Sequence, residues 1–311
     1  MNVAAKSRVM LGAARMGLHN MRAPCSFQPV RPNTLGVIGL GAIGGSLARQ
    51  AKLAGVARVV GWSPEPSERV AGVQQGALDD APPKAADVAR AADLLILAAP
   101  PAANLAQLEA LAPHVRPAAL VSDVGSVKRA IVALAERLGM GARFAGSHPL
   151  AGTHRRGFEA SRADMFRGAV VYVTPCAAGE GAAREIVHFW ETVLAAHAVT
   201  IDATRHDAQL AATSHVPQVI ASLLAHFLAG ATPPGASLGP GALDTTRLAA
   251  SDAVLWTEIL LMNRDQVLPA LRALEEPLGA VERALEAGDG PALTGWLARA
   301  AEWRRRVEPE S

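Results

Sequence analysis

Residues 35–44 read Leu-Gly-Val-Ile-Gly-Leu-Gly-Ala-Ile-Gly, and this stretch decides the fold. Its first five residues form a short apolar run that is typical of a buried strand. Gly39, Gly41 and Gly44 match the pattern G-x-G-x-x-G, and a helical segment follows at residues 46–54. In such a unit the first glycine permits a tight turn, the second lets the backbone approach a pyrophosphate, and the third permits close packing of the helix on the strand. The stretch therefore predicts a dinucleotide-binding loop at a helix N-terminus.

Further apolar runs follow along the chain, separated by Ala-rich segments. The runs are continuous rather than alternating, which is typical of strands buried on both faces of a parallel sheet. The Ala-rich segments fit crossover helices. The predicted strands after the first cover residues 58–62, 93–98, 119–122, 143–146, 169–173 and 197–201.

The strand signals stop at about residue 203. We predict helices at residues 207–230, 250–263, 265–287 and 291–306, with a Pro/Gly loop at 232–241. The fold class is thus an α/β N-terminal domain with a Rossmann-type doubly wound parallel sheet, followed by an all-α C-terminal dimerisation domain. The expected bounds are a basic, disordered extension at 1–33, a dinucleotide-binding domain at 34–203 and a helical substrate and dimerisation domain at 204–311.

One segment of the helical part is strongly apolar on one face. Val219-Ile220, Leu223-Leu224 and Phe227-Leu228 repeat at the i, i+3/i+4 spacing of a helix that buries one side. An ordinary internal core would explain this face. We favour a homodimer interface, because a domain of this size with such apolar helices needs more cover.

The composition excludes several classes of protein. The chain has 311 residues, half of them hydrophobic, and a formal net charge of only +2, which does not suit a nucleic-acid surface. Two cysteines make neither a disulfide framework nor a metal cluster. No apolar run approaches the ~18 residues that span a bilayer. We expect a cytoplasmic protein without a membrane, nucleic-acid or metal partner, although the Arg-rich, acid-free residues 1–33 also resemble an organellar transit peptide.

The second predicted strand carries the residues that should select the cofactor. An acidic residue normally receives the ribose 2′-hydroxyl about 20 residues after the glycine loop. Ser63 stands where the acid is expected, Glu65 lies close by, and Arg69 is the nearest arginine. Because Glu65 would repel a 2′-phosphate, we predict NAD, with NADP possible. The predicted cofactor-binding residues are Gly39, Gly41, Ala42, Ile43, Gly44, Ser63, Ala99, Pro100 and Asp123.

His148 carries the most information about chemistry. It lies in Gly146-Ser-His148-Pro-Leu-Ala-Gly152, at the end of a predicted strand. An unperturbed imidazole has a pKa of about 6.5, so a neutral His148 can accept a proton at physiological pH. A glycine loop for a nicotinamide and a base for the substrate together predict a dehydrogenase; a structural loop histidine is the simpler reading.

Three further polar segments stand out: Asp123-Val-Gly-Ser126-Val-Lys128, Ser214-His215-Val-Pro217 and the stretch from Asp244 to Trp256. With these segments, the glycine loop and the segment around His148, the chain resembles prephenate/arogenate dehydrogenases of tyrosine biosynthesis. The resemblance runs from about Leu35 to about Asp265. It implies a nucleotide domain plus a helical dimerisation domain, and oxidative decarboxylation of prephenate to 4-hydroxyphenylpyruvate with hydride transfer to NAD.

The resemblance also implies roles for individual residues. His148 and Ser126 match the family's catalytic pair, which hydrogen-bonds the ring hydroxyl; Ser126 would also suit a helix N-cap. Arg247 matches the residue that holds a substrate carboxylate, as a guanidinium does bidentately. Asp244 either orients Arg247 or caps the helix, and His215 suits a supporting position better than that of a base. The predicted substrate-binding residues are Arg247, Gln218, His215, Thr153, His154 and Asp244.

This sequence departs from the family pattern at two positions. Gln218 stands where some relatives have a second histidine, and His154 stands where relatives have Glu, followed by Arg155 and Arg156. Both positions face the substrate side chain in the family. A basic rim favours the extra negative charge of prephenate, and arogenate (cyclohexadienyl) dehydrogenase with NAD or NADP is the alternative.

Two other functions compete with this one. β-Hydroxyacid dehydrogenases share the glycine loop and a helical second domain but depend on a lysine base, and the chain has no lysine from Pro175 onwards. A non-catalytic NAD-binding sensor would not require His148, Ser126 and Arg247 together.

Overall fold

The structure is a computed structural model that describes residues 32–153, 155–233 and 235–307. Nearly all of the predicted basic extension lies outside the described residues. Within them, no helix is both long enough and apolar enough to cross a membrane.

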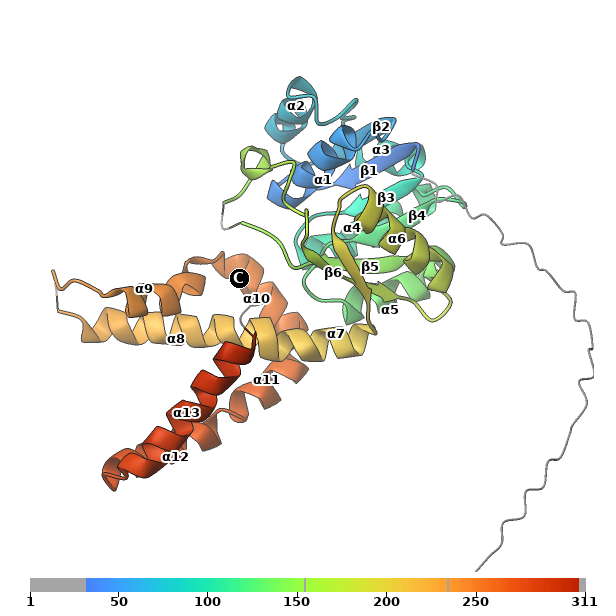
Figure 1. Cartoon of the computed structure of the whole chain (residues 1–311). Coiled ribbons are helices and arrows are strands. Elements are labelled where there is room, and N and C mark those ends of the chain that lie inside the picture. Colours follow the sequence, from blue (N-terminus) through green and yellow to red (C-terminus); the bar gives the residue numbers. More distant parts are fainter. Residues whose placement is uncertain (1–31, 154, 234, 308–311) are drawn as a thin grey trace, which may run out of the picture. The chain divides into compact units, whose positions relative to one another are not determined.

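A four-stranded parallel sheet forms the first half of the α/β part (Figure 1). Its strand order is β2-β1-β3-β4, and every neighbouring pair is parallel. The strands are β1 (Thr34–Ile38), β2 (Arg58–Trp62), β3 (Leu94–Leu97) and β4 (Leu120–Asp123), and the helices that connect or follow them are α1 (Ala42–Leu53), α2 (Pro66–Gln74), α3 (Ala85–Ala91), α4 (Pro101–Leu111) and α5 (Arg129–Arg137).

A second, three-stranded sheet continues beside β4. It has the order β5-β6-β7, with β5 (Ala145–Pro149), β6 (Val170–Pro175) and β7 (His197–Thr200), and α6 (Glu180–Thr192) leads into β7. A parallel bridge between Val121 and Phe144 sets the start of β5 beside β4. β5 and β6 are antiparallel, whereas we expected all strands to be parallel. The segment 150–169 joins them, and its described residues hold no α-helix, so no helical crossover returns the chain to the other end of the sheet.

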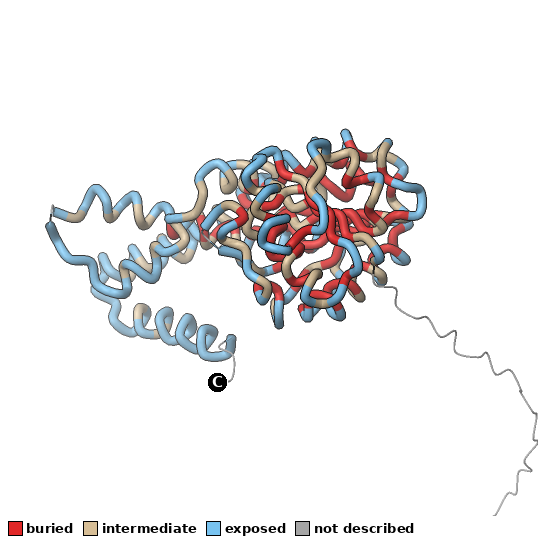
Figure 2. Tube along the Cα trace, turned by 90° about the horizontal axis from the view of Figure 1, so that it is seen from above, coloured by how far each residue is buried: buried red, intermediate tan, exposed pale blue. Residues whose placement is uncertain are grey.

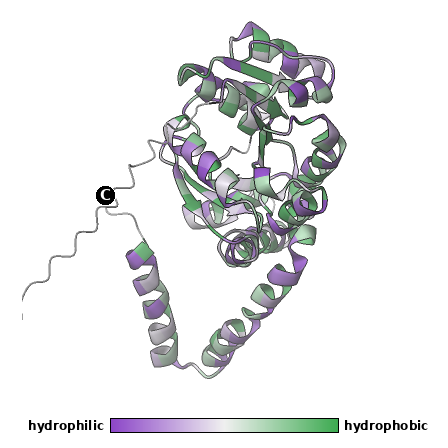
Figure 3. Cartoon of the chain, turned by 90° about the vertical axis from the view of Figure 1, so that its right-hand side faces the viewer, coloured by the Kyte–Doolittle hydropathy of each residue, from purple (hydrophilic) through white to green (hydrophobic). Residues whose placement is uncertain are grey.

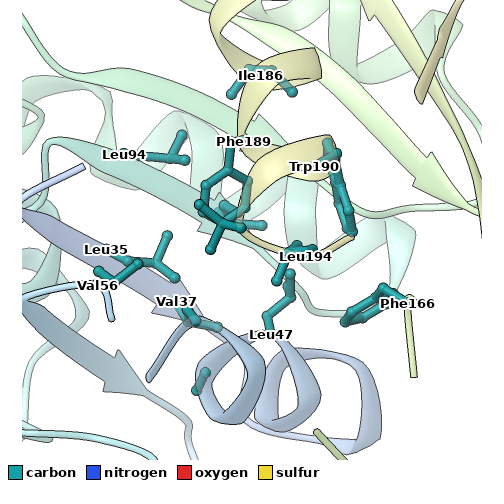
Figure 4. Close-up of a cluster of buried hydrophobic side chains, with 14 of the residues drawn as sticks. Leu35, Val37, Leu47, Val56, Leu94, Phe166, Ile186, Phe189, Trp190 and Leu194 are labelled. Atoms are coloured by element: carbon teal, nitrogen blue, oxygen red, sulfur yellow. The ribbon is translucent and has the colours of Figure 1, made fainter. Parts of the chain in front are cut away.

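One cluster of buried hydrophobic side chains lies between β1, β3, α1 and α6 (Figure 4), and a second lies against α3, α4 and α5. Trp190 of α6 is fully buried, and its ring meets that of Phe166 edge to face at a centroid distance of 5.2 Å. The indole N–H of Trp190 donates to the Ser147 hydroxyl at 2.9 Å. This bond fixes β5 at the residue that precedes His148.

The chain after β7 is helical. Its helices are α7 (Ala203–Leu210), a π-helical turn η4 (Ala211–His215), α8 (Val216–Ala231), α9 (Pro240–Thr246), a 3-10 turn η5 (Arg247–Ala250), α10 (Ala253–Met262), α11 (Arg264–Arg272), α12 (Glu275–Glu286) and α13 (Gly290–Val307). The fold class is therefore confirmed. Figure 2 shows that buried residues concentrate in the α/β part, whereas α12 and α13 hold no buried residue.

Two helix predictions were wrong in detail. Helix α9 forms at the end of the predicted Pro/Gly loop, because Pro240 fits the first turn of a helix, where no backbone donor is needed. The predicted helix at 265–287 is broken after Arg272. Pro277 stands in the first turn of α12, and its ring would clash with the carbonyl group of Ala273 if the helix continued.

Candidate active site

The glycine loop forms the turn between β1 and α1. Gly39 has φ +95°, a conformation that favours glycine. A Cβ at Gly44 would lie 1.8 Å from the Gly39 carbonyl oxygen, whereas one at Gly41 would meet no atom within 4 Å. Gly41 is the N-cap of α1, and no side chain caps that helix. The loop therefore fits a pyrophosphate, which would receive the open backbone at Gly41 and the N–H groups of the first helical turn, at Ala42 and Ile43.

The end of β2 holds a small polar cluster. The buried hydroxyl of Ser63 donates to the carboxylate of Glu68 on α2, and Arg69 donates to the Ser63 carbonyl. Glu65 is exposed. The hydroxyl of Ser63 is thus already engaged, and Glu68 places an additional carboxylate at this strand end.

Asp123, at the end of β4, is paired with a buried lysine. The carboxylate contacts the Lys128 ammonium group, and both side chains are at most 1% exposed. Burial raises the pKa of Asp123 and lowers that of Lys128, because each charged form loses water. Lys128 also donates to the Ser147 carbonyl at 2.8 Å. The pair therefore ties the β4–α5 segment to β5.

Two more predicted cofactor residues lie between β3 and α4. The N–H of Ala99 donates to the Asn104 side chain at 2.9 Å. Pro100 is exposed and is the N-cap of α4. The structure thus places the predicted cofactor residues at the carboxyl ends of β1, β2, β3 and β4, the edge where open α/β sheets bind ligands.

His148 lies near the carboxyl end of β5, the strand of the second sheet that starts parallel beside β4. Its side chain is 8% exposed. Burial, together with the nearby His206, Lys128 and His215, lowers the pKa of His148 well below its ordinary value. His148 is therefore neutral at physiological pH, the state in which an imidazole accepts a proton.

A second histidine and a carboxylate stand behind His148. The Nδ1 atom of His148 lies 2.9 Å from Nε2 of His206, and Nδ1 of His206 lies 2.8 Å from Oδ1 of Asp207. Asp207 also receives the backbone N–H of Lys128 at 2.8 Å and the Nε–H of Arg129 at 3.1 Å. Burial would raise the pKa of Asp207, but these hydrogen bonds lower it. This row of three side chains ends on an anion.

The other predicted residues of the α/β part lie in loops. Ser126 is half-buried in the segment between β4 and α5, two residues before Lys128. Thr153 is exposed, and its hydroxyl accepts the N–H of Arg155 at 3.2 Å. His154 lies outside the described residues. The ion pair between Arg156 and Asp252, the N-cap of α10, ties this loop to the helical part.

The remaining predicted residues belong to the helical part. His215 is buried, lies 3.1 Å from the Asn263 amide, and has its pKa lowered to about 4, mainly by burial. Gln218 donates from Nε2 to the Leu248 carbonyl at 2.8 Å, which holds η5 against α8. Arg247 begins η5 and Asp244 lies in α9; both are exposed, and among the described residues neither side chain has a polar partner.

His206, Asp207 and Arg129 were not among the residues predicted from the sequence. His206 and Asp207 are adjacent on α7, and a His-Asp dipeptide within a helix gives no local sign of what it faces. Their position next to His148 depends on the tertiary structure. Arg129 joins Asp207 to α11 through Asp265, whose oxygens lie 2.6 and 2.7 Å from the guanidinium nitrogens.

A dinucleotide loop at the carboxyl end of β1 and a buried neutral histidine at that of β5, followed by a helical domain, define the class of nicotinamide-dependent dehydrogenases. The model of the prephenate dehydrogenase nucleotide-binding domain matches residues 47–199, and that of the prephenate dehydrogenase dimerization domain matches residues 202–299. The chain belongs to the prephenate dehydrogenase family.

Individual relatives agree with this assignment. The chain is 31% identical over 268 residues to the cyclohexadienyl dehydrogenase of Zymomonas mobilis, which covers 83% of this chain and 90% of the relative. It is 29% identical over 286 residues to the prephenate dehydrogenase of Bacillus subtilis, covering 88% and 75% of the two chains. The crystal structure of A. aeolicus prephenate dehydrogenase with hydroxyphenyl propionate and NAD+ superposes with a TM-score of 0.79 at 26% identity, covering 88% of this chain and 98% of that one.

Proposed function

We propose that the protein is a prephenate dehydrogenase, which decarboxylates prephenate oxidatively to 4-hydroxyphenylpyruvate. The observation that carries the proposal is a buried, neutral His148 at the carboxyl end of β5, which runs parallel beside the sheet that carries the glycine loop. A bound nicotinamide supplies the acceptor for the hydride of the ring carbon. His148 takes the proton of the ring hydroxyl, and loss of the ring carboxylate as CO2 leaves an aromatic product.

The other roles divide between the two domains, which we place at residues 34–203 and 204–311. Ser126 shares the contact with the ring hydroxyl, and Arg247 holds a substrate carboxylate in a two-pronged contact. The exposed guanidinium of Arg247 has no polar partner among the described residues, which leaves it available for that contact. Thr153, His154, His215, Gln218 and Asp244 surround the substrate side chain or support the residues that do.

NAD is the proposed cofactor, with Gly39 to Gly44, Ala99, Pro100 and Asp123 around it. The carboxylates of Glu65 and Glu68 both stand at the end of β2, where a 2′-phosphate of NADP would bring further negative charge. Titration calorimetry with each nucleotide tests this choice. We expect NAD to bind at least tenfold more tightly than NADP, and we expect Glu68→Gln to reduce this difference in affinity. Tighter binding of NADP by the unaltered protein would contradict the assignment.

The activity itself is tested with prephenate and arogenate, each combined with NAD and NADP. The absorbance of the reduced nicotinamide is followed, and CO2 and 4-hydroxyphenylpyruvate are measured as products. We expect the highest rate with prephenate and NAD. Absence of nucleotide reduction with either substrate would reject the proposal.

Arogenate dehydrogenase is a second candidate, and Gln218 favours it. Because Nε2 donates to the Leu248 carbonyl, the other amide atom must be the oxygen, and this buried Oε1 has no partner among the described residues. A lone acceptor suits the ammonium group of arogenate better than the keto acid of prephenate. Gln218→Leu would remove this acceptor without adding a charge, so a shift of kcat/KM towards prephenate would support the second candidate.

We also propose a homodimer formed through the C-terminal helices. Several large apolar side chains of α8 are exposed in the single chain, with Phe227 at 65% and Leu223 at 58%. The last helix, α13, carries both hydrophobic and hydrophilic residues (Figure 3), and its Leu297 and Trp303 are each 59% exposed. Such a face needs cover. Light scattering should report twice the chain mass at micromolar concentration, and a stable monomer would reject the dimer.

A further inference from the structure

The environment of His148 poses an electrostatic problem that the proposed reaction alone does not solve. When His148 accepts the substrate proton it becomes a cation, yet it is buried beside the Lys128 ammonium group. Asp123, the carboxylate nearest to that lysine, is already paired with it. A positive charge that stays on His148 is therefore costly.

The hydrogen bonds behind His148 fix its tautomer. A carboxylate only accepts hydrogen bonds, so His206 must carry its proton on Nδ1, 2.8 Å from Asp207 Oδ1. Neutral His206 then has a lone pair on Nε2, and the facing Nδ1 of His148, 2.9 Å away, must be the donor. The Nε2 atom of His148 is left unprotonated, as a base requires.

Asp207 is held as an anion. The backbone N–H groups of Lys128 and Arg129 and the Arg129 side chain all donate to it, at 2.8 to 3.1 Å. It is 0% exposed, and its hydrogen bonds lower its pKa in spite of burial. A positive charge that forms on His148 can therefore move to His206, where it lies beside the negative charge of Asp207.

We propose that His206, anchored by Asp207, is a positioning residue that holds His148 in the reactive tautomer and accepts a proton from it during the reaction. As the substrate O–H bond breaks, Nε2–H forms on His148; as Nδ1–H of His148 breaks, Nε2–H forms on His206. His148 is then neutral again, and the imidazolium lies against Asp207. The reverse transfer returns the proton to the ring oxygen when the ring becomes aromatic. This role rests on the proposed dehydrogenase function.

Two substitutions of His206 separate its effect on the tautomer of His148 from its acceptance of a proton. His206→Phe keeps a ring but removes both nitrogen atoms. His206→Gln keeps an acceptor oxygen for His148 but cannot carry a proton. His197→Gln is the control, because His197 is an exposed residue of β7 outside the site.

The first readout does not depend on activity. Imidazole nitrogen NMR of the full chain, with His148 assigned by comparison with His148→Asn, should show a protonated Nδ1 and an unprotonated Nε2. His206→Phe should lose this pattern, whereas His206→Gln and His197→Gln should keep it. If the tautomer of His148 is unchanged in a folded His206→Phe protein, the proposal is overturned, whether the dehydrogenase assignment stands or fails.

The second readout is kinetic. We expect His206→Phe to lower kcat on the order of 10²-fold, since a small misplacement of a catalytic group costs about that much. KM should hardly change, because His206 does not touch the substrate. His206→Gln should remain roughly tenfold to a hundredfold below the unaltered enzyme, since it cannot share the charge. Full recovery of kcat by glutamine would overturn the proton transfer.

Discussion

Gly44 lies so close to Gly39 that a single methyl group at position 44 would collide with the Gly39 carbonyl oxygen, at 1.8 Å. At Gly41, two residues beyond Gly39, the same addition meets no atom within 4 Å. Two glycines of one motif thus serve different purposes. One is required by the protein's own backbone, and the other leaves room for a ligand.

This contrast gives the first prediction. Gly44→Ala should disturb the turn and lower the melting temperature, with loss of nucleotide binding as a consequence. Gly41→Ala should leave the melting temperature unchanged and weaken NAD binding alone, because its methyl group would stand where the pyrophosphate approaches. Thermal unfolding and titration calorimetry on the same samples distinguish the two. Equal destabilisation by both would refute this division of roles.

His148→Asn should remove the base and keep a polar side chain. Loss of a general base lowers kcat by about 10²–10⁴-fold. Because burial first, and then the nearby His206, Lys128 and His215, lower the pKa of His148, the unaltered enzyme should keep its kcat/KM as the pH falls to about 6.5 and lose it only at lower pH. A full pH profile checks this. An unchanged kcat in His148→Asn would assign the residue to structure.

Arg247→Ala should affect substrate binding and little else. A guanidinium that holds a carboxylate equally in ground and transition states acts on KM. The expected rise in KM for prephenate is about 10- to 150-fold, and Arg247→Lys should recover only part of it. Arg137→Ala, at an exposed position of α5, is the matched control. If NAD affinity falls while KM for prephenate holds, Arg247 lies on the cofactor side.

The protein should lose stability as the pH falls below about 6.5. The pKa values of His148, His206 and His215 are all lowered in the fold, chiefly by burial. On acidification the unfolded chain therefore binds protons at these histidines before the folded chain does. The stabilisation that the neutral histidines give the fold is complete above the pKa of histidine in the unfolded chain and is lost as the pH falls below it. For His215, with its pKa at about 4, the loss by pH 5 is on the order of 2 kcal/mol. Urea unfolding at pH 7 and pH 5 measures the sum.

The matched variants sharpen this comparison. His215→Asn should flatten part of the pH dependence, whereas His197→Gln should leave it unchanged, because His197 is exposed. Equal unfolding free energies at the two pH values would contradict the assignment of three neutral buried histidines. The lowered pKa of Asp207 adds a further loss only below about pH 4, since that contribution is present above the unfolded pKa of an aspartate.

The strands and the glycine loop could be predicted because their signals are local. A buried parallel strand is a continuous apolar run, and Gly39 to Gly44 carry the turn in their spacing. The direction of β6 could not be predicted, since hydropathy is the same for a parallel and an antiparallel neighbour. Pro277 indicates the break before α12, but the apolar residues repeat with helical periodicity on both sides of the break, which predicted one continuous helix.

The candidate site divides in the same way. His148, Ser126 and Arg247 lie in motifs that can be recognised in the sequence. His206 lies 58 residues from His148 and meets it only through the packing of α7 against β6 and α5. The engagement of Ser63 by Glu68 depends on how α2 turns back over the strand end. Such pairings are set by tertiary structure and leave no periodic mark.

Asp207 has a consequence for how the molecule can be taken apart. This one carboxylate lies on α7, yet it receives the first backbone N–H groups of α5 and also holds the histidine behind the base. Docking of α7 on α5 therefore also fixes the hydrogen-bond partners of His148. On the role that we propose for His148, a chimera with the helices of another protein would keep a competent base only if the first helix of the donor carries the same His-Asp pair in the same register.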